Sequence, residues 1–164
     1  MGDDASSATS ACPATYRLSI RRVTPEDLTA IVQIETASFG RDAWDRECFA
    51  DYLSEPHCLF LVAQKAGAVV GYALAVYNQT RAELDSIAVA PSHRGSGIAV
   101  ALMNRLNALL RRRGVSTMTL MVRLDNAAAI GLYRKLGFRR ERRINGYYED
   151  GAPAWRMRAP CGSV

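Results

Sequence analysis

The sequence has few of the residues that build metal sites or disulfide frameworks. Its 164 residues include four cysteines and two histidines, and none of them has the spacing of metal ligands. The cysteines stand at positions 12, 48, 58 and 161 without a paired pattern, which is typical of a reducing compartment. We therefore expect no metal site.

Long apolar runs are also missing. No stretch is long enough to span a membrane. The acidic start, Met-Gly-Asp-Asp, lacks the apolar core of a secretory signal. From these absences we expect a cytoplasmic protein with no membrane partner.

Lysine is scarce, since Lys65 and Lys135 are the only two. The formal net charge of +5 therefore rests on arginine, which clusters at residues 111–113 and 139–143. Nucleic-acid binding is one interpretation of such clusters. The other interpretation is that the clusters are a solvated helix end and an exposed strand edge, because cations suit a helix C-terminus. The clusters lack the interleaved aromatics of a single-strand binder, so we expect no nucleic-acid partner.

The hydrophobic pattern and length predict one domain, residues 15–159, between a disordered tail at 1–14 and a short tail at 160–164. Strands are expected at 16–23, 59–63, 69–77, 83–89, 115–123, 138–144 and from 154, and helices at 24–39, 44–53, 98–110 and 126–136. The order β-α-α-β-β-β-α-β-α-β-β favours a mixed sheet with helices on both faces. We expect the strand near Ala154 to lie at the sheet edge, where it could pair with a partner or stay free, so the protein is expected to be a monomer or a weak homodimer.

A glycine-bearing turn connects the strand ending near Val89 to the helix that starts at Ile98. Such a turn offers free N–H groups and the positive helix end to an anion, and a phosphate or pyrophosphate suits it best. Gly95 and Gly97 have no Cβ and so permit the backbone to approach the anion closely. Arg94 adds a positively charged guanidinium group that can bind the same anion. The turn is neither a dinucleotide fingerprint nor a P-loop, and by itself it could be an ordinary tight turn.

Two sequence motifs point to a more specific kind of protein. Residues 94–99, Arg-Gly-Ser-Gly-Ile-Ala, match the pattern Arg/Gln-x-x-Gly-x-Gly/Ala. Residues 126–138 match Asn-x-x-Ala-x-x-Leu-Tyr-x-x-x-Gly-Phe. With the order of elements, they resemble the GNAT family of N-acetyltransferases over nearly the whole of residues 16–157. The loop at 146–151, Gly-Tyr-Tyr-Glu-Asp-Gly, is similar to that of the branch that acetylates protein N-termini, which includes the ribosomal-protein alanine acetyltransferases.

The resemblance implies an α/β domain of the α+β type, with a mostly antiparallel sheet of six to seven strands. It also implies direct transfer of the acetyl group of acetyl-CoA to a primary amine in a ternary complex. The implied coenzyme site consists of the strand end, the glycine turn and two helix starts: Ile87, Ala88, Val89, Arg94, Gly95, Ser96, Gly97, Ile98, Ala99, Asn126, Ala129 and Tyr133.

The reaction needs a group that takes a proton from the amine and a group that stabilises the leaving thiolate. The resemblance gives the second role to Tyr133, although a buried tyrosine could simply pack in the core. Where the branch has a catalytic glutamate this chain has Met121, which cannot accept a proton. Glu83 is therefore the first candidate base and Asp85 the second, although Glu83 could be an ordinary exposed acid. Strand alternation predicts that Glu83, Asp85, Ile87 and Val89 share one face.

The acceptor site is expected to involve Phe39, Trp44, Asp85, Met121, Tyr147 and Tyr148. A groove between the loop at 39–44 and the tyrosine pair would favour an extended peptide, and so the N-terminal α-amine of a protein. Gly40 and Ala152–Pro153 depart from the pattern of that branch. A small amine, such as a polyamine, amino acid or antibiotic, is the alternative. A non-catalytic acyl-CoA-binding module is the third hypothesis, motivated by Met121.

Overall fold

The computed structural model describes residues 17–162. The strands are β1 (Ser19–Arg22), β2 (Cys58–Lys65), β3 (Ala68–Tyr77), β4 (Arg81–Val89), β5 (Thr117–Arg123), β6 (Arg139–Ile144) and β7 (Ala154–Pro160). The α-helices are α1 (Leu28–Phe39), α2 (Arg46–Leu53), α3 (Ile98–Arg111) and α4 (Ala127–Lys135), with 3-10 turns at Pro25–Asp27, Gly40–Asp42 and Pro91–His93. The expected tail at 1–14, and Tyr16, lie outside the described residues.

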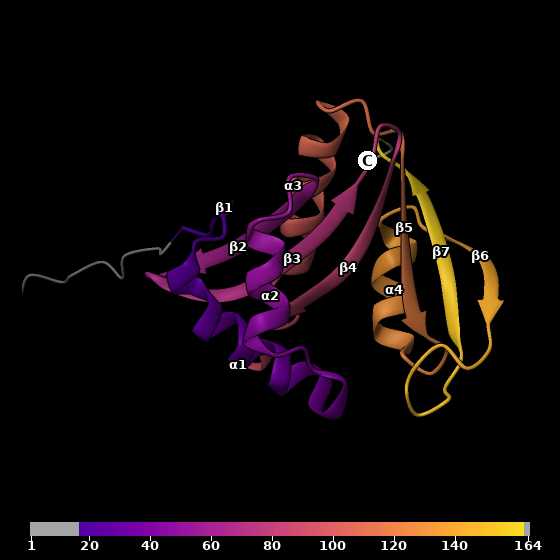
Figure 1. The fold of residues 1–164 in the computed structure, drawn as a ribbon, viewed down its shortest axis with the longest axis horizontal. Coiled ribbons are helices and arrows are strands. Elements are labelled where there is room, and N and C mark those ends of the chain that lie inside the picture. Colours follow the sequence, from indigo (N-terminus) through magenta and orange to yellow (C-terminus); the bar gives the residue numbers. More distant parts are fainter. Residues whose placement is uncertain (1–16, 163–164) are drawn as a thin grey trace, which may run out of the picture.

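The strands form one seven-stranded sheet in the order β1-β2-β3-β4-β5-β7-β6 (Figure 1). Every neighbouring pair is antiparallel except β4 and β5, which are parallel. The predicted mixed, mostly antiparallel sheet is confirmed, at the upper end of the expected strand number. The edge strands, however, are β1 and β6. The expectation that the strand near Ala154 lies at the edge is wrong, because β7 inserts between β5 and β6.

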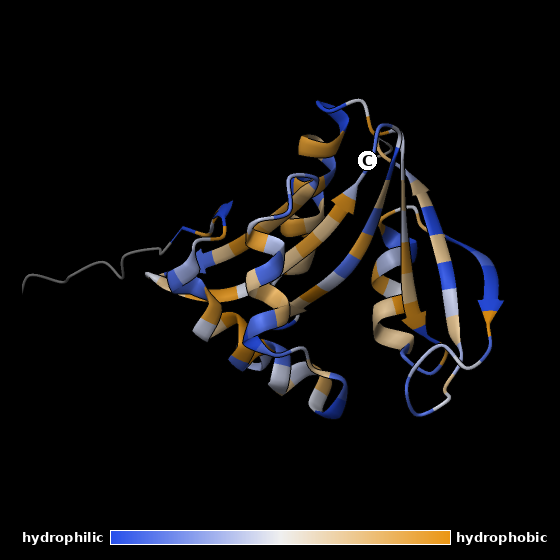
Figure 2. Ribbon diagram, viewed as in Figure 1, coloured by the Kyte–Doolittle hydropathy of each residue, from blue (hydrophilic) through white to orange (hydrophobic). Residues whose placement is uncertain are grey.

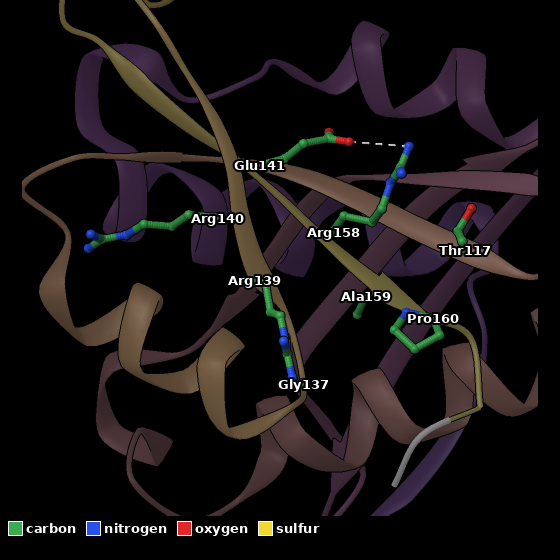
Figure 3. A pocket seen from close by; sticks show the side chains of 8 residues that line it. All are labelled: Thr117, Gly137, Arg139, Arg140, Glu141, Arg158, Ala159 and Pro160. Atoms are coloured by element: carbon green, nitrogen blue, oxygen red, sulfur yellow. Dashed lines mark ion pairs between the residues drawn. The ribbon is translucent and has the colours of Figure 1, made fainter.

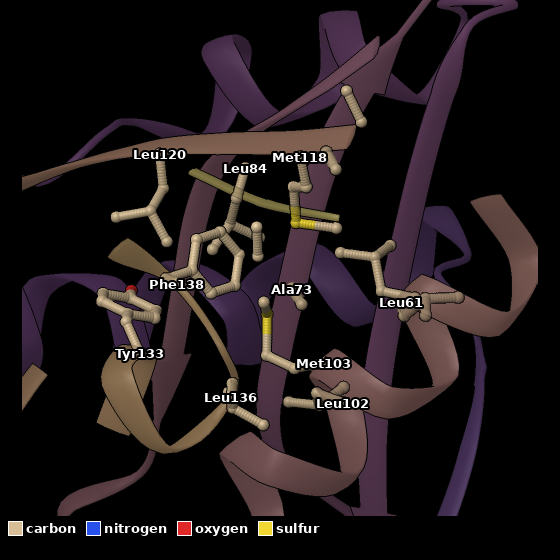
Figure 4. Close-up of a cluster of buried hydrophobic side chains, with 14 of the residues drawn as sticks. Leu61, Ala73, Leu84, Leu102, Met103, Met118, Leu120, Tyr133, Leu136 and Phe138 are labelled. Atoms are coloured by element: carbon tan, nitrogen blue, oxygen red, sulfur yellow. The ribbon is translucent and has the colours of Figure 1, made fainter. Parts of the chain in front are cut away.

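Helices cover both faces of the sheet, as predicted. α1 and α2 pack on one face around Ile31, Phe49 and Tyr72. α3 and α4 pack on the other around Leu102, Met103 and Phe138 (Figure 4). The central strands are apolar on both sides, whereas β6 is the most hydrophilic strand (Figure 2). No helix within residues 17–162 combines the length and apolar character needed to cross a membrane.

β4 and β5 pair over only four positions. The ladder runs from Arg81 opposite Thr117 to Leu84 opposite Leu120, and then the two strands diverge. α4 lies beside the separated ends, between β4 and β5 in Figure 1. Beyond Leu84 and Leu120, each strand end lacks a neighbour only on the side that faces the other strand. We call this split between β4 and β5 the wedge.

A β-bulge at Asp85 marks the point of divergence. On the opposite side of β4, Leu74 of β3 faces Ser86 and Ala75 faces Leu84, so Asp85 has no partner on β3. An inserted residue of this kind breaks the ladder and bends the strand. The bulge therefore coincides with the point at which β4 leaves β5.

The bulge also redistributes the side chains of β4. Glu83 pairs with Val76, on the face covered by α1 and α2. Ile87 and Val89 pack into the core on the opposite face, beneath α3 and α4. The prediction that Glu83, Asp85, Ile87 and Val89 share one face is therefore wrong, because the extra residue reverses the alternation beyond it.

β3 approaches the end of β4 closely at Gly71, where a side chain would be crowded. A Cβ placed there would lie 3.0 Å from the carbonyl oxygen of Ala88 and 3.3 Å from Ile98 Cγ2. We expect Gly71→Ala to destabilise the protein by about 1–3 kcal/mol, since backbone must move to relieve the contact. Urea unfolding followed by circular dichroism measures the loss.

Gly131→Ala is the matched control. Gly131 lies inside α4, where an added Cβ meets nothing within 4 Å. In a helix interior alanine is favoured over glycine by about 0.5–1 kcal/mol, so this variant should be as stable as the parent or more stable. Equal stability of Gly71→Ala and the parent would contradict the close approach.

Candidate active site

The turn between β4 and α3 presents a row of free backbone donors. Gly95 and Gly97 adopt φ of 74° and 81°, which glycine reaches without strain. Within residues 17–162, the backbone N–H groups of residues 95–100 donate to no protein acceptor. Unpaired donors at the start of a fourteen-residue helix suit the phosphates of the coenzyme that the resemblance implies. The predicted anion turn thus has a suitable geometry.

Arg94 holds this turn in place. Its Nε donates to Val89 O at 3.1 Å and its Nη2 to Ser38 Oγ at 3.0 Å. Two of the three guanidinium nitrogens are thereby used to tie the turn to β4 and α1. Arg94 was expected to bind the anion directly. The contacts that the structure shows instead hold the predicted anion turn in place.

Asn126 and Tyr133 lie on α4, next to the wedge. Asn126 caps the helix, because its Oδ1 accepts the N–H of Ala129 at 3.0 Å. Its Nδ2 donates to no group within residues 17–162 and is available to a ligand. Tyr133 is 7% exposed and its ring packs against Phe138 at 5.8 Å (Figure 4). Its hydroxyl bonds to no group in residues 17–162. Burial raises the pKa of Tyr133 above its usual value, so the phenol keeps its proton as a free donor.

The two candidate bases differ in environment. Glu83 is exposed. Asp85 is partly buried, and Tyr52 of α2 donates a hydrogen bond to its Oδ2 at 3.1 Å. Burial raises the pKa of Asp85 to about 6, and the charge of Glu83 adds to the rise. A pKa of this size suits a group that takes a proton near neutral pH.

Aromatic side chains surround these carboxylates. The Trp44 ring stacks on Tyr52 at 5.7 Å, with only 8° between the planes. Tyr147 and Tyr148 meet edge to face at 5.0 Å. Burial raises the pKa of Tyr147, and the charges of Glu83 and Asp85 raise it further. The charges of the predicted carboxylates thus act on the predicted tyrosine loop.

Two other predicted acceptor residues lie at the edges of this region. Phe39 ends α1 and is one of the few exposed large apolar side chains among the described residues. Met121 is partly buried and stands one position beyond the last pair of β4 and β5. Both are placed to contact an acceptor, but neither has a group that can transfer a proton.

Glu35 is a buried acid that the sequence analysis missed. It is 2% exposed, and its Oε1 accepts the N–H of Trp44 at 3.1 Å. Its Oε2 accepts a hydrogen bond from the hydroxyl of Tyr72, which in turn lies 2.8 Å from Ser86 Oγ. Glu35 follows Ile31 and Ile34 at helical spacing, so the buried stripe of α1 was the available signal. The network connects the loop before α2 to the bulge on β4.

Arg123, at the end of β5, also escaped the sequence analysis. Its Nη1 lies 2.9 Å from Asp150 Oδ2 and its Nη2 2.5 Å from Asp42 Oδ2. Its guanidinium carbon lies 4.1 Å from the centre of the Tyr148 ring. The three partners are 25 to 81 residues away in sequence, and no local pattern points to them.

A hollow on the outer strands lies away from this region. Its lining includes Arg139, Arg158 and Thr117, and Arg158 pairs there with Glu141 at 3.3 Å (Figure 3). Thr117 starts β5, whereas Arg123 ends it beside the wedge, and at about 3.3 Å per residue these two ends of the strand are roughly 20 Å apart. The hollow is therefore separate from the candidate active site.

Glu35→Gln should preserve the network while removing its charge, since an amide can accept from Trp44 and donate to Tyr72. Burial raises the pKa of Glu35 above its usual 4.5. A raised pKa weakens folding as the pH rises from the unfolded value through the folded one. We therefore expect Glu35→Gln to gain stability relative to the parent between pH 4.5 and pH 8, measured by urea unfolding across that range. A pH-independent difference would contradict an ionising Glu35.

Comparisons with known proteins agree with this geometry. The model of the acetyltransferase (GNAT) family matches residues 27–138. N-alpha-acetyltransferase RimI of Mycobacterium tuberculosis is 34% identical over 154 residues, covering 90% of this chain and 96% of that protein.

Solved structures give the same result. The ribosomal-protein-S18-alanine N-acetyltransferase from Escherichia coli is 31% identical with a TM-score of 0.80, and the match covers 90% of this chain and 96% of that one. Ard1 from Thermoplasma volcanium is 29% identical with a TM-score of 0.82, covering 87% and 97%. From the family match and the full-length similarity, we conclude that this chain belongs to the acetyltransferase (GNAT) family.

Proposed function

We propose that this enzyme acetylates the N-terminal α-amine of a protein, with the N-terminal alanine of ribosomal protein bS18 as the first acceptor to test. The observation that carries the proposal is the similarity to N-alpha-acetyltransferase RimI over 90% of the chain. The aromatic surroundings of Glu83 and Asp85 support it, since they can hold an extended peptide beside a proton acceptor. An acceptor of this kind agrees with the cytoplasmic location and the monomer or weak homodimer that we expect.

As a family member the chain is an enzyme that uses acetyl-CoA, which speaks against a non-catalytic binding module. The coenzyme supplies the acetyl thioester. The free N–H groups of residues 95–100 fit its phosphates, and the free amide of Asn126 fits the polar groups of its pantetheine arm. We assign the remaining chemistry to side chains beside the wedge.

Asp85 is the better base of the two carboxylates. An α-ammonium must lose a proton before it can attack, and a base works best when its pKa is near the working pH. Asp85 has a pKa of about 6 and is held by Tyr52, whereas Glu83 is exposed. Asp85 Oδ1, which is free of the bond from Tyr52, takes the proton. Glu83 attracts and orients the ammonium group. This reverses the order in which the sequence ranked them.

Tyr133 acts on the leaving group. Its hydroxyl retains its proton at neutral pH and has no protein acceptor among residues 17–162, so it can donate to the thiolate sulfur as that charge develops. The ring is fixed by its packing against Phe138. Tyr133 therefore offers a single, preoriented donor.

Paired variants of Asp85 and Glu83 test the choice of base. With an alanine-starting peptide, Asp85→Asn should lower kcat by about 10²- to 10⁴-fold, the usual contribution of a general base, and Glu83→Gln by much less. In the parent, kcat/KM for the peptide should fall as the pH drops through about 6, where Asp85 becomes protonated, and Asp85→Asn should lose this limb of the pH profile. Thiol release from acetyl-CoA measures both.

The same assay separates the acceptor classes. Peptides with a blocked N-terminus should not react, and polyamines and free amino acids should react slowly. Turnover of small amines alone would move the function to a small-molecule acetyltransferase. A larger loss in Glu83→Gln than in Asp85→Asn would assign the base to Glu83.

Tyr133→Phe tests the role of the hydroxyl. The ring and its contact with Phe138 remain, so we expect unchanged thermal stability and an unchanged Kd for CoA. The loss of a proton donor should lower kcat by about 10²-fold or more. Calorimetric titration of CoA with single-turnover kinetics checks both, and full activity of Tyr133→Phe would show that the hydroxyl is not used.

A further inference from the structure

Arg123 connects three separate parts of the chain at the wedge. It ends β5, and it binds Asp42 in the turn before α2 and Asp150 in the loop between β6 and β7. Its planar group also stacks at 4.1 Å on Tyr148, in that same loop. One side chain thus fixes the two loops that flank the candidate acceptor site.

The contact requires the shape of arginine. Nη1 donates to Asp150 and Nη2 to Asp42, while the flat face covers the Tyr148 ring. Lysine has the same charge but a single nitrogen and no flat face. It could hold one loop but not both loops and the ring at once.

The exposure of the group argues against a role in overall stability. The side chains are 25% exposed for Arg123, 34% for Asp42 and 56% for Asp150, and ion pairs this accessible to water contribute little to folding. Their effect is to restrict two loops that lie far apart in the sequence. Since Tyr147 packs edge to face against Tyr148 in the same loop, the restriction extends to Tyr147.

We propose that Arg123 is a positioning residue for the acceptor, which holds the loops around Asp42 and Asp150 at the spacing that the amine-bearing substrate requires. It does so without touching the reacting atoms. The inference rests on the proposed acetylation of a peptide amine. It predicts a defect in acceptor use and none in the binding of acetyl-CoA.

Steady-state kinetics test the proposal. Arg123→Lys and Arg123→Gln should each raise the KM for an alanine-starting peptide by about tenfold or more, as expected when a bound substrate is misplaced. The KM for acetyl-CoA and the thermal midpoint should stay at the parental values. Asp150→Asn, which frees only one loop, should give a smaller rise. Full activity of Arg123→Lys, or an equal rise in both KM values, would overturn the proposal.

Arg113→Lys is the matched control. Arg113 also lies over a tyrosine ring, that of Tyr77, and donates to its hydroxyl at 3.1 Å. It lies beyond the C-terminal end of α3, however, whereas the glycine turn precedes the other end. The same change there should leave both KM values unchanged.

Hydrogen exchange tests the connection between the loops independently of the acceptor. In Arg123→Lys the amides of both residues 40–45 and residues 145–153 should exchange faster than in the parent, and Arg113→Lys should alter neither. Unchanged exchange in either loop would overturn the proposal even if no peptide were acetylated. Absence of peptide turnover by the parent, with faster exchange in Arg123→Lys, would reject the proposed acceptor but retain the connection.

Discussion

The candidate active site depends on the early end of one strand pairing. β4 and β5 are parallel neighbours for four positions and then separate after Leu84 and Leu120. If the pairing continued, the sheet would be unbroken between β4 and β5. The anion turn, Tyr133 and the carboxylates would then have no opening between them for a ligand. Because it stops, backbone at both strand ends is left free for a ligand, and the N-terminal part of α4 lies beside the opening. The bulge at Asp85 gives a physical reason for the divergence, since an unpaired residue bends β4 there.

A bulge needs other contacts to fix its conformation, because the inserted residue has no partner in the ladder. Here buried polar contacts fix it. Ser86, next to the bulge, binds Tyr72, which binds Glu35, which in turn binds the backbone of Trp44. On the other side Asp85 binds Tyr52, whose ring stacks on Trp44. The contacts form a closed circuit through α1, α2, β3 and β4. Burying a carboxyl group is unfavourable unless its oxygens are bonded, and the circuit bonds both oxygens of Glu35 while it fixes the direction of Asp85.

The sequence predicted most of the fold and part of the site. What could be predicted depends on local sequence, and what was missed depends on contacts between residues far apart in the chain. The glycine turn and the order of elements are encoded within short segments, and they were found. The shared face of Glu83 and Ile87 was predicted wrongly, because the bulge has no residue signature in the strand itself. Glu35 was detectable as an acid on a buried helical stripe. Arg123 was not, because its partners lie 27 and 81 residues away. The edge position of β6 follows from strand order, which no single segment specifies.

The arginine clusters find a physical explanation at that edge. β6 reads Arg-Arg-Glu-Arg-Arg-Ile and all but its last residue are exposed. The outer side of an edge strand has free backbone groups, and it can pair with the same strand of a second molecule. In such a pairing several arginines would face one another with only Glu141 to offset them, and Glu141 is already bonded to Arg156 and Arg158 of β7. Like charges directly opposite one another destabilise a ladder. The charge that first suggested a nucleic-acid partner is thus explained as protection of this sheet edge against pairing with a second copy of β6.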